Sequence, residues 1–235
     1  MRFFVLFAFA LAGSAGWTFS AEPLLIEVAA EKCDRKDVPA SCELPKDWAT
    51  KALLLTDVEA NQAIACQVQT GSPLRLFWML DELPKGATRR YRIEEAAEVQ
   101  TPEAAPMVSA TEGERDLLLS VQGKPVLKYQ HAVMSSDDPA KPFYKRSGFI
   151  HPIYDPLQRE LTEAMPPDHM HQHGIMFAWV NAEFEGRKVD FWNSHKEQGE
   201  VRHAKLVASH SGPVFASFSA QLEHLDDTAP GGPKV

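Results

Sequence analysis

Apolar and polar residues alternate in short runs along most of the chain, and turn-forming residues separate these runs. The clearest run is Val214–Leu222, in which every second residue from Val214 to Leu222 is apolar. The polar residues Ser217, Ser219 and Gln221 lie between them. Successive side chains of a β-strand point to opposite faces, so this run predicts a half-buried strand. Runs rich in β-branched and aromatic residues predict further strands at Ala52–Thr56, Ile64–Gln69, Leu74–Leu80, Leu117–Val121, Val126–Met134, Ile175–Val180 and Val201–Ser209.

Helical periodicity is scarce by comparison. Leu157–Ala164 is the one segment that predicts a short helix, ended by Pro166 and Pro167. Many short strands between turn signals favour an all-β fold, and we expect an antiparallel β-sandwich. A stretch rich in proline and glutamate, Glu94–Glu114, suggests a boundary near residue 110. The predicted regions are 22–110, an N-terminal β region, and 111–235, a histidine-rich β-sandwich region.

The first 21 residues have the pattern of a secretory signal peptide. Arg2 precedes the apolar run Phe3–Ala12, and small residues follow it up to Ala21. The run is shorter than the roughly 20 apolar residues that a spanning helix needs, and no later segment approaches that length. We therefore expect a secreted or periplasmic protein with no membrane insertion after removal of residues 1–21.

The net charge of the chain argues against one class of partner, and its three cysteines allow at most one internal disulfide. The chain has 24 Lys and Arg against 32 Asp and Glu, a formal net charge of −8, which argues against nucleic acid as a partner. Export permits a disulfide, and the short loop between Cys33 and Cys42 makes this the preferred pair, with Cys66 as the free thiol; Cys66 with either partner stays open.

Histidine is concentrated in the C-terminal half, and three imidazoles alternate in the segment Asp168–Gly174. In an extended segment His169, His171 and His173 would project to one face. Imidazole is a common ligand of transition metals, so the spacing predicts a possible divalent transition-metal site formed by these three histidines. His151, His195 or His203 would complete the site, and Asp168 would ligate or orient a histidine. The alternative is that these histidines bind a polar substrate or stabilise a loop.

Basic and aromatic residues surround this segment. Tryptophan faces stack on the C–H surfaces of sugars, while charged and imidazole groups hydrogen-bond hydroxyls or a carboxylate. A carbohydrate or another small polar ligand would fit such a lining, and the alternative is that the aromatic residues belong to the core. The predicted substrate-binding residues are Lys145, Arg146, His151, Trp179 and Trp192, and the predicted catalytic residues are Asp168, His169, His171 and His173.

The same segments resemble a known bacterial family. The matching residues are Arg146–Pro152, Pro167–Gly174, Phe177–Trp179 and Asp190–Trp192, with a weaker match at Leu53–Glu94. These motifs resemble the PmoA-like family, labelled after a methane oxygenase. The resemblance implies a secreted β-sandwich protein from bacteria that degrade polysaccharides. It also implies that C-terminal strands are missing here, because family members continue for several strands beyond Leu225.

Three functions fit these residues. The first is a carbohydrate-active enzyme, a hydrolase, lyase or epimerase, with a histidine as acid or base. The second is a metal-dependent oxidoreductase that uses the same histidines as ligands. The third is a non-catalytic glycan-binding module. A stoichiometric bound metal would favour the second, and tight glycan binding without turnover would favour the third.

Overall fold

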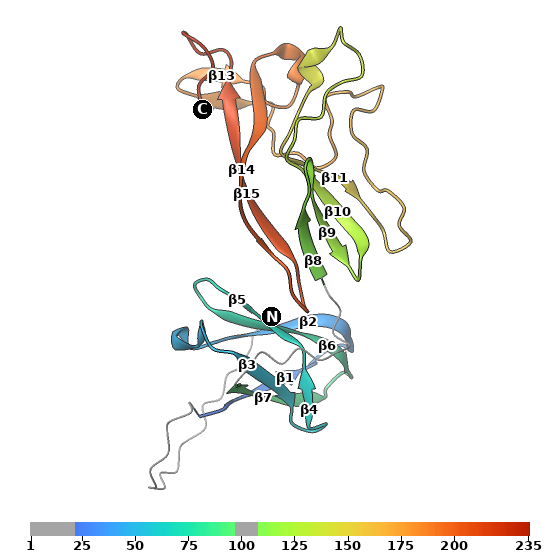
Figure 1. Ribbon diagram of the computed structural model, residues 1–235, viewed down its shortest axis with the longest axis vertical. Helices are drawn as coiled ribbons and strands as arrows, with labels where there is room; N and C mark the ends of the chain where they lie inside the picture. The colour runs from blue at the N-terminus through green and yellow to red at the C-terminus, as the bar shows by residue number, and fades with distance from the viewer. Residues whose placement is uncertain (1–21, 97–107) are drawn as a thin grey trace. The chain divides into compact units, whose positions relative to one another are not determined.

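A computed structural model describes residues 22–96 and 108–235 of the chain (Figure 1). The chain forms two compact units, Met1–Pro106 and Met107–Val235, referred to below as the N-terminal unit and the C-terminal unit. The predicted signal peptide, residues 1–21, lies outside the described residues. All paired strands in both units are antiparallel, which confirms the predicted all-β, sandwich-like fold.

The N-terminal unit contains two antiparallel sheets. One has the strand order β1-β7-β3-β4 and the other has the order β2-β6-β5. Buried side chains from both sheets form one core, in which the rings of Trp78 and Tyr91 contact each other edge to face at 5.2 Å. The unit is therefore a two-sheet sandwich. Its elements are β1 (Leu24–Ala29), β2 (Arg35–Glu43), the 3₁₀ turn η1 (Lys46–Trp48), β3 (Leu53–Asp57), β4 (Gln62–Ile64), β5 (Cys66–Gln69), β6 (Arg75–Leu83) and β7 (Thr88–Glu95).

Strand β6 shows why this sandwich forms. Leu74, Leu76, Trp78 and Leu80 are buried, and the residues between them are half-buried or exposed. Each buried side chain of this size stabilises the fold by roughly 1.5–3 kcal/mol. Because β6 pairs with β2 on one side and with β5 on the other, its inward face lies at the centre of its sheet. The strand predicted at Leu74–Leu80 is confirmed.

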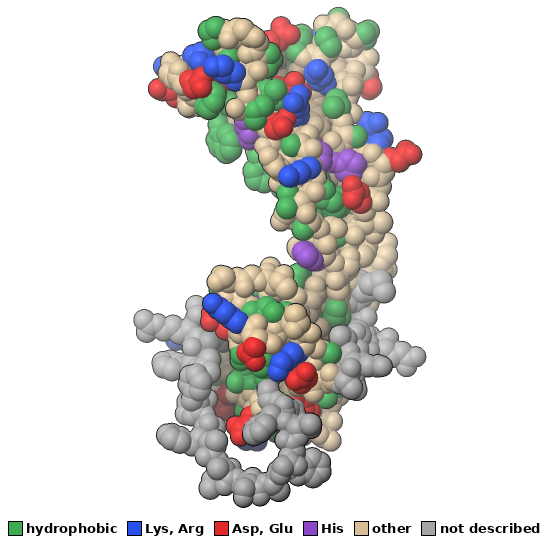
Figure 2. Space-filling view, turned by 60° about the vertical axis from the view of Figure 1, so that its left-hand side comes forward, with side chains coloured by type: hydrophobic (Ala, Val, Ile, Leu, Met, Phe, Trp, Pro, Cys, Tyr) green, Lys and Arg blue, Asp and Glu red, His purple; other side chains and the backbone are tan. Residues whose placement is uncertain are grey.

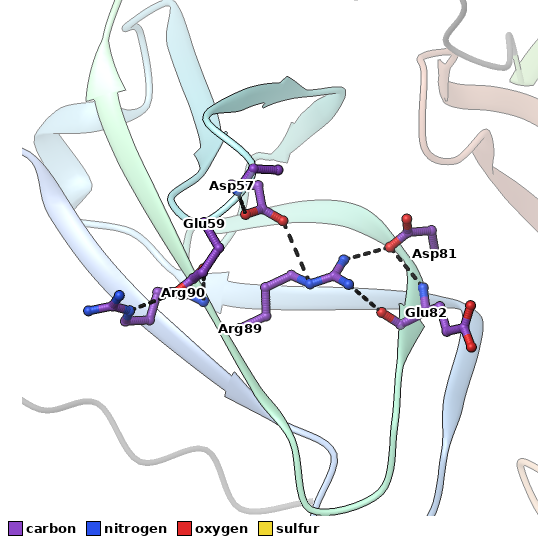
Figure 3. A network of polar contacts seen from close by, with 7 residues as sticks. Asp57, Glu59, Asp81, Glu82, Arg89 and Arg90 are labelled. Atoms are coloured by element: carbon purple, nitrogen blue, oxygen red, sulfur yellow. Dashed lines mark hydrogen bonds and ion pairs between the residues drawn. The ribbon is translucent and has the colours of Figure 1, made fainter.

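Arg89 links the two sheets through a network of polar contacts (Figure 3). This arginine of β7 contacts the carboxylate of Asp57, at the end of β3, at 3.6 Å. It also pairs with Asp81 of β6 at 2.6 Å and donates to the carbonyl of Glu82 at 2.6 Å. Arg89, Asp57 and Asp81 therefore each have a partner of opposite charge.

The C-terminal unit has a different construction, with short sheets and long connections (Figure 1). One sheet has the order β11-β10-β9-β8, and two hairpins are formed by β12 with β13 and by β14 with β15. Its small core contains Ala178, Val189, Phe191 and Val201. The elements are β8 (Val108–Glu112), β9 (Asp116–Val121), β10 (Lys124–Gln130), the 3₁₀ turn η2 (Pro142–Tyr144), β11 (Phe149–Ile153), β12 (Ala182–Phe184), β13 (Arg187–Val189), the 3₁₀ turn η3 (Ser194–Lys196), β14 (Gly199–His210) and β15 (Ser217–Asp226).

The long β14–β15 hairpin is joined to the four-stranded sheet at two places. Val108 and Gly212 exchange two backbone hydrogen bonds, of 3.0 and 2.9 Å. Further along, the hydroxyl of Tyr129 lies 2.9 Å from Nδ1 of His203. Burial raises the pKa of Tyr129 to about 12, so this phenol stays protonated. His203, which the sequence suggested as an additional metal ligand, therefore connects the hairpin to the sheet.

The helix predicted at Leu157–Ala164 is wrong. The carboxylate of Asp155 accepts hydrogen bonds from the backbone nitrogens of Leu157, at 2.8 Å, and Arg159, at 2.9 Å, and thereby closes a turn. Gln158 has a φ of 65°, which is incompatible with a right-handed helix. Asp side chains commonly stabilise turns by capping the following backbone in this way. In the described part of the chain the helical elements are short 3₁₀ turns, and none could span a membrane.

The predicted Cys33–Cys42 disulfide is also wrong. All three cysteines are free thiols. Cys33 precedes β2 and Cys42 lies near its other end. An extended strand rises about 3.3 Å per residue, so the two thiols are far beyond the reach of a disulfide. Cys42 and Cys66 instead pack against the core, where burial raises their pKa values to about 12 and about 11.

Candidate functional site

The histidine segment of the C-terminal unit is a pair of turns, not a strand. The backbone nitrogen of His169 donates to the carbonyl of Pro166, and that of Gln172 donates to the carbonyl of His169, both at 2.9 Å. Every second residue therefore no longer points to the same side. The prediction that three imidazoles converge on one face is wrong, because Pro166 and Pro167 start a turn where the alternation suggested an extended segment.

His173 is a buried structural residue. Its side chain is fully buried, its ring contacts that of Phe149 at 5.0 Å, and its Nδ1 lies 3.2 Å from the carbonyl of His171. Burial lowers the pKa of His173 to about 4, so the imidazole is neutral at neutral pH. The next residue, Gly174, has a φ of 60°, and a Cβ there would collide with the carbonyl oxygen of Ile150. The end of the histidine segment is thus fixed by packing against β11.

His169 and His171 lie away from His173, on the turn. Nδ1 of His169 is 3.0 Å from the carboxylate of Asp168, and both side chains are largely exposed. The ring of His171 lies 5.9 Å from that of His169, 6.1 Å from that of His195 and 6.4 Å from that of Trp192. Burial, followed by the charges of His195 and His169, lowers the pKa of His171.

The predicted metal triad is therefore not formed. His173 faces the interior while His169 faces solvent, and no group of three His, Cys, Asp or Glu side chains within residues 22–96 and 108–235 is arranged to hold a metal ion. On the face shown in Figure 2, histidine side chains appear at separate places on the C-terminal unit. A divalent transition metal at His169, His171 and His173 does not fit this geometry.

Two other predicted site residues lie apart from the turn. Nδ1 of His151 is 3.0 Å from the hydroxyl of Thr162, and burial lowers the pKa of this imidazole. Trp179 is 57% exposed and stacks on the ring of His224 at 5.1 Å. The segment Ile175–Val180, which was predicted to be a strand, pairs with β11 only through Ile175. Within the described residues, neither His151 nor Trp179 forms a hydrogen bond or a ring contact with His169 or His171.

Arg146 and Lys145, both predicted to bind substrate, line a pocket with a volume of about 180 Å³. We refer to it as the Arg146 pocket. Its remaining polar lining consists of Ser194, Glu197, Glu200 and Asp227, and its apolar lining consists of Phe143, Gly199 and Val201. These residues lie in or directly after the η2 and η3 turns and at the open end of the β14–β15 hairpin, where β14 begins and β15 ends.

The guanidinium of Arg146 is the most unusual group in this pocket. Arg146 is only 3% exposed, and its Nη2 donates to the carbonyl of Phe191 at 3.0 Å. Its Nε and Nη1 are buried and have no hydrogen-bond partner among the described residues, and the same is true of Oγ of Ser194. Burial lowers the pKa of Arg146, and the charge of Glu200 opposes this shift. Buried donors without partners are rare in native proteins, so the Arg146 pocket is a candidate binding site.

Asp190 holds the loop that brings Ser194 to the pocket. This buried carboxylate accepts hydrogen bonds from the backbone nitrogens of Trp192, at 3.0 Å, and Asn193, at 2.9 Å. It also accepts from Nδ2 of Asn193 and from Nζ of Lys196, both at 2.8 Å. Although burial opposes ionisation, these hydrogen bonds lower the pKa of Asp190 to about 2. The carboxylate is therefore ionised at any physiological pH and keeps the loop closed.

Three carboxylates of the Arg146 pocket were not predicted from the sequence. Glu197 and Asp227 are exposed and Glu200 is half-buried, so they form the outer part of the pocket. Burial and the neighbouring charges of Glu200 and Asp226 raise the pKa of Asp227. No motif joins these residues in the sequence. The usable signal for Ser194 is Asp190, because an aspartate that precedes a short loop commonly closes it through the following backbone nitrogens.

The positive charge of Arg146 also acts on two imidazoles of the histidine segment, those of His171 and His173. It contributes to the lowered pKa values of both His171 and His173, after burial in each case. His195 follows Ser194 directly in the chain and contacts His171. The turn histidines and the Arg146 pocket are thus neighbouring parts of the C-terminal unit.

Comparison with curated proteins and with solved structures finds no match for this chain. A scan against family models matches residues 116–234, about half of the chain, to a family of unknown function, DUF6807. The resemblance to the PmoA-like family is therefore wrong, because no model of that family matches. The motifs that suggested it lie within the matched region, apart from the weaker match at Leu53–Glu94. The chain belongs to DUF6807, a family of unknown function.

Proposed function

We propose that the C-terminal unit binds a small hydroxyl-bearing ligand, of the carbohydrate class, in the Arg146 pocket. The observation that carries this proposal is the pair of unpartnered buried donors on Arg146, together with the unpartnered hydroxyl of Ser194 in the same pocket. A sugar hydroxyl both accepts and donates hydrogen bonds. It can therefore accept from Arg146 while other hydroxyls donate to the carboxylates of Glu200 and Asp227.

The size of the pocket limits the ligand. A volume of about 180 Å³ is smaller than the roughly 300–1,000 Å³ of sites for drug-sized molecules, so the ligand would fill it with about one ring. Phe143 adds an apolar side chain that suits the C–H face of a sugar. The geometry supports binding. Catalytic roles for Asp168, His169, His171 and His173 stay a prediction, and His173 has the least access to any ligand because it is fully buried.

A binding experiment on the full chain tests the proposal. Calorimetry with a panel of monosaccharides should detect binding to the natural sequence, and Ser194→Ala should weaken it about tenfold, by removing one hydrogen bond to the ligand. Because Oγ of Ser194 forms no hydrogen bond within residues 22–96 and 108–235, this variant should melt at the same temperature as the natural sequence. Arg202→Met is a matched control, since Arg202 pairs with Glu223 outside the pocket and its loss should leave binding unchanged. Equal affinity of the natural sequence and Ser194→Ala, or no binding of any sugar, would contradict the proposal.

A further inference from the structure

We infer that the ligand of the Arg146 pocket is an acidic sugar, a uronate, whose carboxylate binds the guanidinium of Arg146. This inference rests on the proposed function and specifies its ligand. It concerns a buried charge that has no ion-pair partner among residues 22–96 and 108–235.

A comparison of the buried charged side chains shows how unusual Arg146 is. Four Asp, Glu, Lys or Arg residues are buried among those described: Asp57, Arg146, Asp190 and Asp226. Each of the three aspartates has an ion-pair partner, at 3.6, 2.8 and 2.6 Å respectively for Arg89, Lys196 and Arg187. No carboxylate lies within ion-pair distance of Arg146 in the described part of the chain, and Glu200 affects it only at longer range.

A buried charge of this kind calls for an anion. Burying an unpaired ion is strongly unfavourable, whereas a buried ion pair with its hydrogen bonds satisfied is tolerated. Arg146 lines the pocket, and its Nε and Nη1 are buried there without hydrogen-bond partners among the described residues, so an anion in the pocket would lie beside an uncompensated charge. A neutral sugar would satisfy these hydrogen bonds but would leave the charge of Arg146 uncompensated.

The three carboxylates that line the Arg146 pocket favour some anions over others. Glu197, Glu200 and Asp227 lie around the outer part, where only Lys145 opposes them. They repel a doubly charged phosphate or sulfate more strongly than a singly charged carboxylate. They also require hydrogen-bond donors, which sugar hydroxyls supply and a simple inorganic anion does not. One carboxylate on one hydroxylated ring matches both parts of the pocket and its volume.

Matched ligands test the inference on the natural sequence, without any variant. Titration calorimetry of the full chain would compare D-galacturonate with its methyl ester and with D-galactose, which share their ring hydroxyls and differ at one carbon. Uronate should bind roughly tenfold or more tightly than either neutral ligand, because a hydrogen bond to a charged partner is stronger than one to a neutral partner. The advantage should shrink from 50 mM to 500 mM salt.

Two variants test whether the preference for uronate comes from the guanidinium of Arg146. Arg146→Gln should remove the preference for uronate, and Arg202→Gln, which removes a charge outside the pocket, should change the affinity by less than about threefold. If Arg146→Gln fails to fold, Ser194→Ala in the same titrations still reports whether uronate occupies this pocket.

The outcomes separate the two proposals. If galactose and galacturonate bind equally, the ligand is a neutral sugar, so the inference is wrong and the proposed function stands. If sulfate or acetate binds and no sugar does, both are wrong. Tight uronate binding that survives both Ser194→Ala and Arg146→Gln would place the anion elsewhere and overturn the inference.

Discussion

Buried polar atoms without a hydrogen-bond partner are scattered in the N-terminal unit and gathered at one pocket in the C-terminal unit. In the N-terminal unit the core consists of strand residues from two sheets, and the buried carboxylate of Asp57 is paired with Arg89 (Figure 3). Two of its buried atoms form no hydrogen bond among the described residues, Nε1 of Trp78 and Nε of Arg92; they lie on different strands, and the second is 3.3 Å from the carboxylate of Glu94. In the C-terminal unit three of the four such atoms belong to Arg146 and Ser194 and line one pocket.

This difference places the larger packed core in the N-terminal unit and the candidate binding site in the C-terminal unit. A regular sandwich leaves few polar groups that need an outside partner, because each strand residue is either paired in the sheet or packed in the core. The C-terminal unit has long connections whose backbone and side chains must find partners individually. Loops held by a rigid scaffold are where binding residues usually lie, and the Arg146 pocket follows this rule. The predictions below test the contrast, from the largest expected effect to the smallest.

Trp78→Ala should have the largest effect and should be confined to the N-terminal unit. Trp78 is 1% exposed at the centre of the core, and removing a buried Trp destabilises a domain by about 3–5 kcal/mol. Hydrogen–deuterium exchange by mass spectrometry would measure protection in peptides of each unit. Peptides from residues 22–96 should lose protection and those from 108–235 should retain it. Equal loss in both units would show that they are one cooperative structure.

Mild acid should destabilise the C-terminal unit selectively through His173. Its folded pKa, about 4, is below the unfolded value of 6.5, so the unfolded state binds the proton first. The stability that the neutral imidazole provides is complete above about pH 6.5 and is lost as the pH falls towards 4, by up to about 3 kcal/mol. The N-terminal unit, residues 22–96, contains no histidine and should not respond in this range.

Urea unfolding at pH 7 and pH 4.5, followed by exchange of peptides from each unit, measures this effect. His173→Phe serves as the control, because it keeps an aromatic ring against Phe149 and removes the titrating group. The variant should show a smaller pH dependence. An unchanged pH dependence in His173→Phe would mean that other groups cause the acid sensitivity.

Asp190→Asn should loosen the loop that carries Ser194. The carboxylate accepts four hydrogen bonds, and weakening charged hydrogen bonds of this kind lowers the free energy of unfolding by about 1–3 kcal/mol. Because its folded pKa, about 2, is below the ordinary value of 3.8, the stabilisation is present above about pH 4 and lost as the pH falls towards 2. Thermal melting and monosaccharide titration should both show a loss. Asp168→Asn, at an exposed aspartate, should change the melting temperature little, and similar losses in both variants would argue against the role of Asp190.

Arg90→Met should have the smallest effect, below about 1 kcal/mol, because the arginine is 61% exposed and its partner Glu59 is 48% exposed. Arg89→Met should lower the free energy of unfolding more, since it leaves the buried carboxylate of Asp57 without its ion-pair partner. Urea unfolding would measure both changes. Equal losses in the two variants would show that the pairing of Asp57 contributes no more than an exposed ion pair does.

The sequence by itself determined the class of the fold and most of its regular strands. Leu74–Leu80 and Val201–Ser209 are rich in strand-forming residues, and both lie largely in strands. Val214–Leu222 alternates apolar and polar residues, and the strand β15 begins within it at Ser217. Alternation is a local property, because neighbouring residues decide which face each side chain occupies. The same rule misled at His169–His173, where two prolines start turns and the alternation of histidines has no structural meaning.

Only the tertiary structure decided what meets at the candidate site. The sequence predicted that Lys145 and Arg146 bind substrate. It could not show that the buried guanidinium of Arg146 donates to the carbonyl of Phe191, far along the chain. Ser194, Glu200 and Asp227 carry no shared motif and meet because a loop closed by Asp190 packs beside the β14–β15 hairpin. Such contacts join residues that are remote in sequence, and the packing of whole elements fixes them. Local patterns of apolar and polar residues contain no information about them, which is why the strands could be predicted and the pocket could not.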